Sequence, residues 1–316
     1  MANLALLCRT ATTFSRNGDI DEEALRQYLQ RFVDAKVGVY LCSGGSGEGH
    51  ALTPDELRRV YTIGVAVCGG KVAVNANPPE QNTARATRDH TLLAIDAGVE
   101  VVNIYGPAML HGFRPTDAEL IAFFDISLSS IRHPVALAPN PVIGYTLKAE
   151  LIASVCRKHH QVVAVNLPNL GDKYLIDLKD MIARDIEYYV PLTGTPHTFT
   201  LGAAGIIGGE LNLVPKTFRR YVDLFESGNT DELALVYADL ERFCQYMTNP
   251  KWYPTPARGI KMAMQALKLP GGEGGLREPY LMPAADVFQE FTEGLLRLRV
   301  PEIDEAARAA GLSIPA

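Results

Sequence analysis

The chain of 316 residues is long enough to bury one large core. Apolar residues make up 47% of it and charged residues 21%, as in an ordinary globular enzyme, and the net charge of −6 comes without any basic block. We therefore expect neither nucleic-acid binding nor attachment to an anionic membrane. The five cysteines are scattered without a C-x-x-C pair, and neither a basic leader nor a run of about 18 apolar residues is found, so we expect a reducing cytoplasm.

Short apolar runs alternate with longer segments of helical periodicity over the first two-thirds of the chain. Eight of these runs are strand candidates: Leu4–Leu7, Val37–Cys42, Val72–Val74, Val101–Tyr105, Val135–Ala138, Val162–Val165, Glu187–Leu192 and Ala204–Ile207. Most are largely apolar rather than alternating, which is typical of parallel strands covered on both faces. Their recurrence roughly every 20–35 residues suits strand, loop and helix in a (β/α)8 TIM barrel.

Helix-start signals lie between the strand candidates. Asp21 precedes two glutamates, and Thr53 and Thr116 each stand three residues before a glutamate, which is the spacing of a capping box. Apolar residues follow at the spacing of one helix face. Because strands and helices alternate throughout, we predict a single barrel domain over residues 1–217.

Past Phe218 the pattern is helical only. We predict a C-terminal helical extension over residues 218–316, packed on the barrel. The run Gly271–Gly275 is flanked by helices rather than fed by a strand into a helix, so we interpret it as a flexible loop and not as a phosphate cradle. The last stretch, Val300 to Ala316, is expected to pack loosely on the surface.

The candidate site residues follow the ends of the strands, where parallel barrels place their active sites. The loop Gly44–Glu48, with the sequence Gly-Gly-Ser-Gly-Glu, follows the second strand. Its glycines allow backbone amides to point into one concavity and Ser46 adds a hydroxyl, a combination that suits a carboxylate or oxyanion. We predict that substrate is bound by a set of loop residues: Gly45, Ser46, Glu48, His50 and Asn140.

The loop Gly44–Glu48 and the strand Gln161–Asn166 together resemble the dihydrodipicolinate synthase / N-acetylneuraminate lyase family of pyruvate-handling barrel enzymes. Asn17–Asp21, Leu192–Lys216 and Pro254–Pro279 resemble further segments of that family in the same order, so that the resemblance covers most of residues 2–300. It implies a (β/α)8 barrel, a grip on a substrate carboxylate by Ser46 and its neighbouring amides, and a homotetramer built as a dimer of dimers.

The catalytic positions depart from the pattern of the family. The resemblance implies a Schiff-base lysine at the end of strand six, where this chain has Asn166, and a proton-relaying tyrosine at strand five, where it has Ala138. An amide cannot form an imine, whereas a desolvated lysine amine attacks a carbonyl. Lys173, just beyond strand six, is the best relocated nucleophile, although a solvated surface side chain is the favoured interpretation.

Histidines offer a different route to catalysis. His50, His111 and His197 follow strands two, four and seven, and a histidine can act as general acid or base near neutral pH. Two of them with Glu48 would also suit a divalent metal, but we predict no metal site and no other cofactor.

Three functions stay open from the sequence. The first is a lyase or hydratase that acts on a small oxo acid without a Schiff base at the usual position. In it Ser46 holds the carboxylate, Asn166 bonds the carbonyl, and a histidine, His111 or His197, moves the proton. The second is a catalytically degenerate carboxylate-binding protein on the same scaffold, and the third is a metal-dependent aldolase. We prefer the first because the loop residues facing the presumed pocket remain polar.

Overall fold

A closed barrel of parallel strands forms the centre of the computed structural model, which describes residues 3–252 and 255–315. Within those residues the strands are β1 (Ala5–Arg9), β2 (Gly38–Leu41), β3 (Val74–Ala76), β4 (Val101–Tyr105), β5 (Val135–Ala138), β6 (Val162–Asn166), β7 (Glu187–Val190) and β8 (Gly205–Gly208). They pair in chain order, and β1 closes the ring against β8 with Leu7 opposite Ile207. The predicted (β/α)8 barrel is confirmed.

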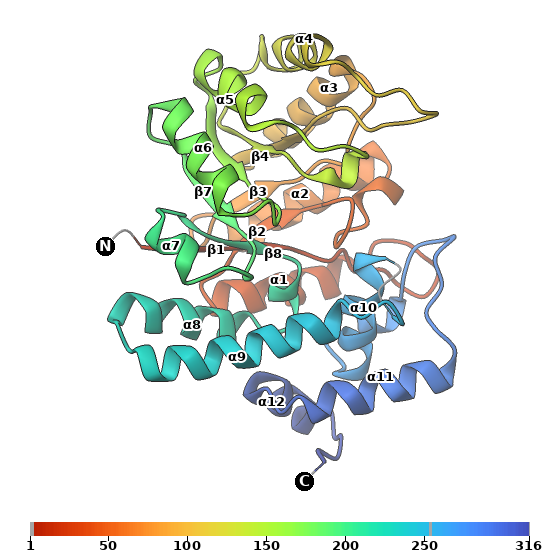
Figure 1. Ribbon diagram of the computed structural model, residues 1–316. Helices are drawn as coiled ribbons and strands as arrows, with labels where there is room; N and C mark the ends of the chain where they lie inside the picture. The colour runs from red at the N-terminus through yellow and green to blue at the C-terminus, as the bar shows by residue number, and fades with distance from the viewer. Residues whose placement is uncertain (1–2, 253–254, 316) are drawn as a thin grey trace.

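Helices follow the strands on the outside of the barrel (Figure 1). They are α1 (Glu22–Asp34), α2 (Pro54–Cys68), α3 (Ala84–Asp96), α4 (Asp117–Leu128), α5 (Ala149–Lys158), α6 (Asp172–Ile182), the single turn α7 (His197–Thr200) and α8 (Pro215–Ser227). The predicted starts are confirmed, because the side chains of Asp21, Thr53 and Thr116 accept hydrogen bonds from first-turn amides. Thr53 and Thr116 form full capping boxes, so these helices begin where the sequence indicates.

The C-terminal helices gather on one side of the barrel beside α8 (Figure 1). They are α9 (Thr230–Met247), α10 (Pro256–Ala266), α11 (Ala285–Arg297) and α12 (Pro301–Ala309). Helix α8 runs across the predicted boundary at residues 217 and 218. Because α8 follows β8 in the strand–helix alternation, we propose that the division between barrel and extension lies after α8, near Gly228, which caps α8 in the left-handed conformation.

Two expectations about the C-terminal part were wrong. The stretch after Val300 is not loosely packed, because α12 buries Ile303 and Ala307 against the core. The Gly271–Gly275 loop is tightly packed rather than open: a Cβ on Gly274 would lie 1.5 Å from the Phe14 carbonyl oxygen. Its glycines therefore allow close approach of two backbones.

The side chains inside the barrel change from apolar to polar along the strands. A small apolar cluster fills one layer: Leu7, Tyr40, Ala136, Ala164, Tyr189 and Ile207. Since side chains two residues apart on a strand share a face, the next inward positions on β1 and β6 are Arg9 and Asn166. The inward-facing surface thus becomes polar toward the C-terminal ends of the strands. Among the residues described, no helix is both long and apolar enough to cross a membrane.

Candidate active site

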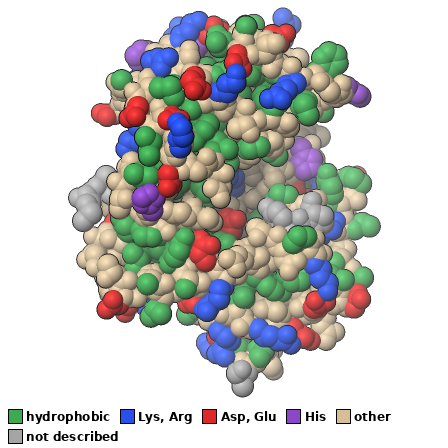
Figure 2. Space-filling model, viewed as in Figure 1, with side chains coloured by type: hydrophobic (Ala, Val, Ile, Leu, Met, Phe, Trp, Pro, Cys, Tyr) green, Lys and Arg blue, Asp and Glu red, His purple; other side chains and the backbone are tan. Residues whose placement is uncertain are grey.

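A cavity of about 330 Å³ opens at the C-terminal ends of the strands. Its polar lining comes from strand ends and the loops that follow them: Arg9, Ser43, Ser46, Glu80, Tyr105, Asn140 and Glu210. Met247, Pro256 and Ile260, from the end of α9 and from α10, complete the wall. Figure 2 shows the visible face hollowed between the barrel loops and the C-terminal helices. The extension therefore contributes to the site.

Arg9 brings a positive charge into this cavity from the end of β1. The guanidinium atoms Nε and Nη2 are buried and have no hydrogen-bond partner among the described residues. The backbone at this point is fixed by Asn212, whose amide donates to the carbonyl oxygens of Arg9, at 2.8 Å, and Gly209, at 2.6 Å. A buried charge without partners is costly. The cavity thus presents guanidinium donors that suit a bound anion.

The loop Gly44–Glu48 forms the wall beside Arg9. Its shape is fixed by backbone contacts: the Gly47 amide donates to the Ser43 carbonyl at 3.1 Å, and the Thr12 hydroxyl donates to the Gly47 carbonyl at 2.7 Å. A Cβ on Gly209 would lie 2.5 Å from the Ser46 hydroxyl oxygen, so glycine at 209 leaves room for that hydroxyl in the cavity wall. The predicted binding residues Gly45 and Ser46 both line the cavity.

Glu48 supports this loop from behind instead of lining the cavity. Its Oε1 lies 3.4 Å from the Nζ of Lys261, and its Oε2 accepts a hydrogen bond of 2.9 Å from the Arg277 backbone amide. Lys261 is fully buried and also donates to the carbonyls of Thr12 and Gly275. Burial lowers the pKa of Lys261, and the nearby Glu48 carboxylate opposes that shift.

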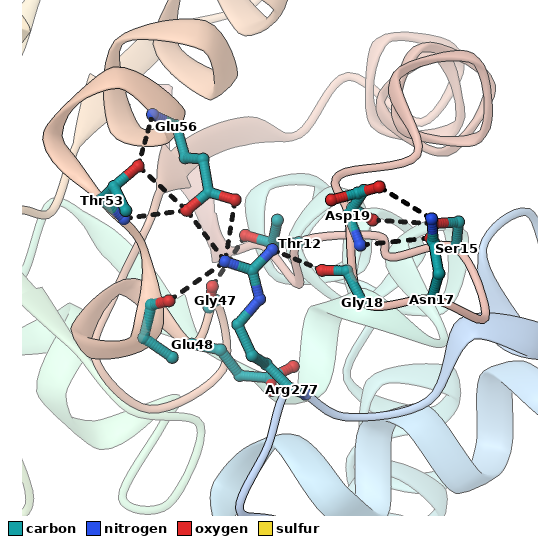
Figure 3. Close-up of polar contacts among 11 residues, drawn as sticks. Thr12, Ser15, Asn17, Gly18, Asp19, Gly47, Glu48, Thr53, Glu56 and Arg277 are labelled. Atoms are coloured by element: carbon teal, nitrogen blue, oxygen red, sulfur yellow. Dashed lines mark hydrogen bonds and ion pairs between the residues drawn. The ribbon is translucent and has the colours of Figure 1, made fainter.

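The Arg277 side chain extends this anchorage to the start of α2. Figure 3 shows its guanidinium between Glu56 on one side and Gly18 on the other. It bonds both carboxylate oxygens of Glu56 at 2.8 Å, and Glu56 also accepts from the Thr53 amide. The loops after β1 and β2 are thereby tied to the C-terminal segment through hydrogen bonds and an ion pair.

Asn166 and Asn140 lie at different depths in the site. Asn166 is fully buried and donates from Nδ2 to Asn103 Oδ1 at 2.8 Å, but it is not part of the cavity lining. Its Oδ1 and the Asn103 Nδ2 are buried without partners among the described residues. Asn140 lines the cavity and caps the following turn by accepting from the Val142 amide at 3.1 Å. Asn140 is therefore better placed than Asn166 to contact a bound substrate directly.

The structure does not bring the predicted histidines into the cavity. His50 is exposed, with Nδ1 2.8 Å from the Gly44 carbonyl oxygen, and its ring meets Tyr280 edge to face. His111 is exposed on the loop after β4, and His197 is exposed with Nε2 3.1 Å from Asp172. None of the three is a lining residue. Substrate binding by His50 and proton transfer by His111 or His197 stay predictions, and the positions of these side chains outside the cavity do not favour them.

No lysine is among the described residues that line the cavity. Lys173 is exposed on α6, where both carboxylate oxygens of Asp177 accept hydrogen bonds from its Nζ. That pairing raises the pKa of Lys173, the opposite of what a nucleophilic amine needs. The interpretation of Lys173 as a solvated side chain agrees with this placement. Within the described ranges no group of three histidine, cysteine or carboxylate side chains is arranged to hold a metal ion.

Sequence reasoning missed two charged residues of the cavity. Arg9 lies two residues beyond the strand candidate Leu4–Leu7, but β1 continues to it, and the alternation Ala5, Leu7, Arg9 points its side chain inward. Glu80 follows two prolines in the loop after β3 and is not among the predicted site residues. Burial raises the pKa of Glu80 above its usual value, although its own backbone amide and the charges of His50 and Arg9 oppose the shift.

Comparisons with known proteins give a consistent result. The model of the dihydrodipicolinate synthetase family matches residues 4–296. A 4-hydroxy-tetrahydrodipicolinate synthase from Xanthomonas axonopodis pv. citri is 28% identical over 301 residues, which is 90% of this chain and 93% of that protein.

Solved structures share the fold. Dihydrodipicolinate synthase from Aquifex aeolicus superposes with a TM-score of 0.80 at 17% identity, covering 99% of this chain and 100% of that one. The prophage protein YagE from E. coli, of the dihydrodipicolinic acid synthase family and solved in complex with pyruvate, gives 0.82 at 16% identity over 94% of this chain and 98% of that one. Because the family model spans nearly its whole length, this chain belongs to the dihydrodipicolinate synthetase family.

Proposed function

We propose that this protein is a lyase or hydratase that binds a small oxo acid non-covalently in the barrel-mouth cavity, without a Schiff base at the end of strand six. Membership of the family supports a lyase or aldolase type of function. The observation that carries the finer proposal is Arg9, whose Nε and Nη2 are buried in the cavity without partners. A planar guanidinium binds a carboxylate through two parallel hydrogen bonds.

The rest of the lining suits the remainder of an oxo acid. With Arg9 on the carboxylate, the Ser46 hydroxyl and the Asn140 amide are the neutral donors available to a carbonyl or hydroxyl oxygen. Donors fixed in a partly water-excluded cavity stabilise charge that develops on such an oxygen when a neighbouring bond breaks. A cavity of about 330 Å³ is of the size that small-molecule sites have.

Covalent catalysis through an imine is not supported by the described residues. Strand β6 ends in Asn166, and the buried Lys261 is held by two carbonyls and Glu48. Neither side chain is available as an amine nucleophile. We therefore propose that the carbonyl is polarised in this cavity through hydrogen bonds and charge.

A carboxylate-binding protein without catalysis is the second candidate. The residue favouring it is Ala138, which ends β5 where the resemblance implies a proton-relaying tyrosine. No observation favours the metal-dependent aldolase. The homotetramer and the cytoplasmic location stay predictions.

Calorimetric titration with pyruvate and longer oxo acids, combined with assays for product, tests the proposal. Arg9→Leu should weaken binding by about 10- to 100-fold, because a hydrogen bond to a charged group contributes about 1.5–3 kcal/mol. The matched control is Arg85→Leu on the exposed surface of α3, which should bind as the wild type does. Equal affinity of the Arg9 variant would refute the proposed anion site. Binding without product from any oxo acid would favour the second candidate.

A further inference from the structure

The carboxylate of Glu80 shares the cavity with the unpartnered guanidinium of Arg9 and with Tyr105. Glu80 belongs to the loop between β3 and α3, and its side chain reaches across to the loop after β2. A Cβ on Gly44 would lie 2.9 Å from Glu80 Oε2, so the glycine at 44 is what allows the carboxylate to lie there. The carboxyl group is thus held at the cavity wall by the path of two loops.

The charged and titratable groups around Glu80 come from three other elements. Arg9 faces it from β1, His50 from the turn after β2, and Tyr105 from β4. Tyr105 accepts a hydrogen bond of 3.0 Å from Asn77 Nδ2, and burial raises the pKa of its hydroxyl, so Tyr105 stays protonated near neutral pH. His50 is exposed and does not line the cavity, and Arg9 and Tyr105 stay protonated near neutral pH, so of these four groups Glu80 is the proton acceptor that lines the cavity.

We infer that Glu80 is the general acid–base residue of this cavity, acting on an oxo acid whose carboxylate is held by Arg9. The inference rests on the proposed function and names the residue that performs its proton transfer. The C–H bond beside the carbonyl breaks, its proton binds a carboxylate oxygen of Glu80, and its electron pair forms the enolate. Return of a proton from the Glu80 carboxyl to that carbon restores the oxo acid, so in D2O the methyl group of pyruvate gains deuterium.

Two features of Glu80 match this role. Burial raises its pKa above the ordinary value of a glutamate, and a carboxylate with a raised pKa is a stronger base for proton transfer. Arg9 beside it supplies positive charge, which stabilises the enolate oxygen as it forms. The other carboxylate of the lining, Glu210, lies against Gly208 at the end of β8: a Cβ there would be 2.5 Å from Glu210 Oε2. Glu210 is the natural rival for the role.

Deuterium exchange into the pyruvate methyl group in D2O, followed by NMR, tests the assignment. Glu80→Gln keeps the shape of the side chain and should slow the exchange by about 100-fold or more, the scale of a lost acid–base group. Its affinity for pyruvate should be unchanged or higher, because a negative charge beside the bound anion is removed. Glu80→Asp should restore part of the rate. Glu210→Gln is run as the rival, and Asp55→Asn, exposed at the start of α2, as the control.

Each outcome decides a different point. Binding with exchange lost only in Glu80→Gln supports the role. Binding with equal exchange in wild type and Glu80→Gln, or with exchange lost only in Glu210→Gln, overturns the assignment to Glu80 and leaves the anion site standing. Binding by the wild type with no exchange above the uncatalysed rate overturns it too. Absence of wild-type binding to pyruvate and to the longer oxo acids refutes the proposed function, and the role of Glu80 falls with it.

Discussion

The pair of Lys261 and Glu48 offers a direct test of how the cavity wall is held. Lys261 is fully buried and Glu48 is 2% exposed, with 3.4 Å between Nζ and Oε1. In Lys261→Met the ammonium is lost while most of the side-chain volume stays. The carbonyls of Thr12 and Gly275 then lose a charged donor, and the Glu48 carboxylate keeps its bond from the Arg277 amide but loses the opposite charge.

The expected loss of stability is large for one substitution. Removing one partner of a buried ion pair destabilises a protein by about 3–5 kcal/mol, because the other charge stays buried without compensation. That is a substantial part of the roughly 5–15 kcal/mol by which folded proteins are stable. The double variant Lys261→Met with Glu48→Gln removes both charges, so it should be more stable than the sum of the two single effects by about 1–3 kcal/mol.

Urea unfolding followed by circular dichroism measures these free energies, with Lys173→Met as the control. Lys173 makes a solvent-exposed pair on α6, so its loss should change stability by less than about 1 kcal/mol. Loss of the Ser46 loop geometry should also weaken oxo-acid binding in Lys261→Met. A change under about 1 kcal/mol in that variant, or strict additivity in the double variant, would show that the pair does not hold the loop.

Two further predictions concern the strand ends. Asn212→Ala should destabilise the protein by about 4 kcal/mol, because it removes two buried hydrogen bonds, with Ala11 and Tyr28, and two partly buried ones, with Arg9 and Gly209, at about 1 kcal/mol each. A loss below about 1 kcal/mol in thermal unfolding contradicts this. Burial raises the pKa of Glu80 above its usual value of 4.5. Above about pH 4.5 the folded state therefore binds more protons than the unfolded chain, and the free energy of unfolding falls as the pH rises through the raised pKa. Glu80→Gln removes this loss of stability, which amounts to about 1.4 kcal/mol per pKa unit. The melting temperature of the variant should therefore equal or exceed that of the wild type at neutral pH, with no such gain below pH 4.5. A variant that is less stable than the wild type at neutral pH contradicts this sign.

The fold could be read from the sequence because its signals are local. Each strand is a short apolar run, and each capping box, such as those that begin at Thr53 and Thr116, marks a helix start with a motif of four consecutive residues. Boundaries were less accurate: β1 extends to Arg9 and β3 begins two residues later than expected. At such ends a charged residue can continue a strand when its side chain points into a barrel rather than into the apolar layer outside.

The site could be predicted only in part, since its residues meet through tertiary structure. Ser46 and Asn140 were predicted as binding residues because they follow strand ends, and both line the cavity. The role of Glu48 was not visible, because its partner Lys261 lies 213 residues away and comes from a helix of the extension. Glu80 reaches the cavity through the path of a proline-containing loop, which hydrophobic periodicity does not describe.

The most direct test of non-covalent oxo-acid binding is trapping with borohydride. The protein is incubated with pyruvate and borohydride at concentrations that saturate binding by calorimetry, and its intact mass is measured alongside a relative that carries the strand-six lysine. The proposed mechanism predicts saturable binding that depends on Arg9, with no mass added to this chain while the relative is labelled. A stable adduct that maps to one lysine of this chain would contradict it and restore imine chemistry.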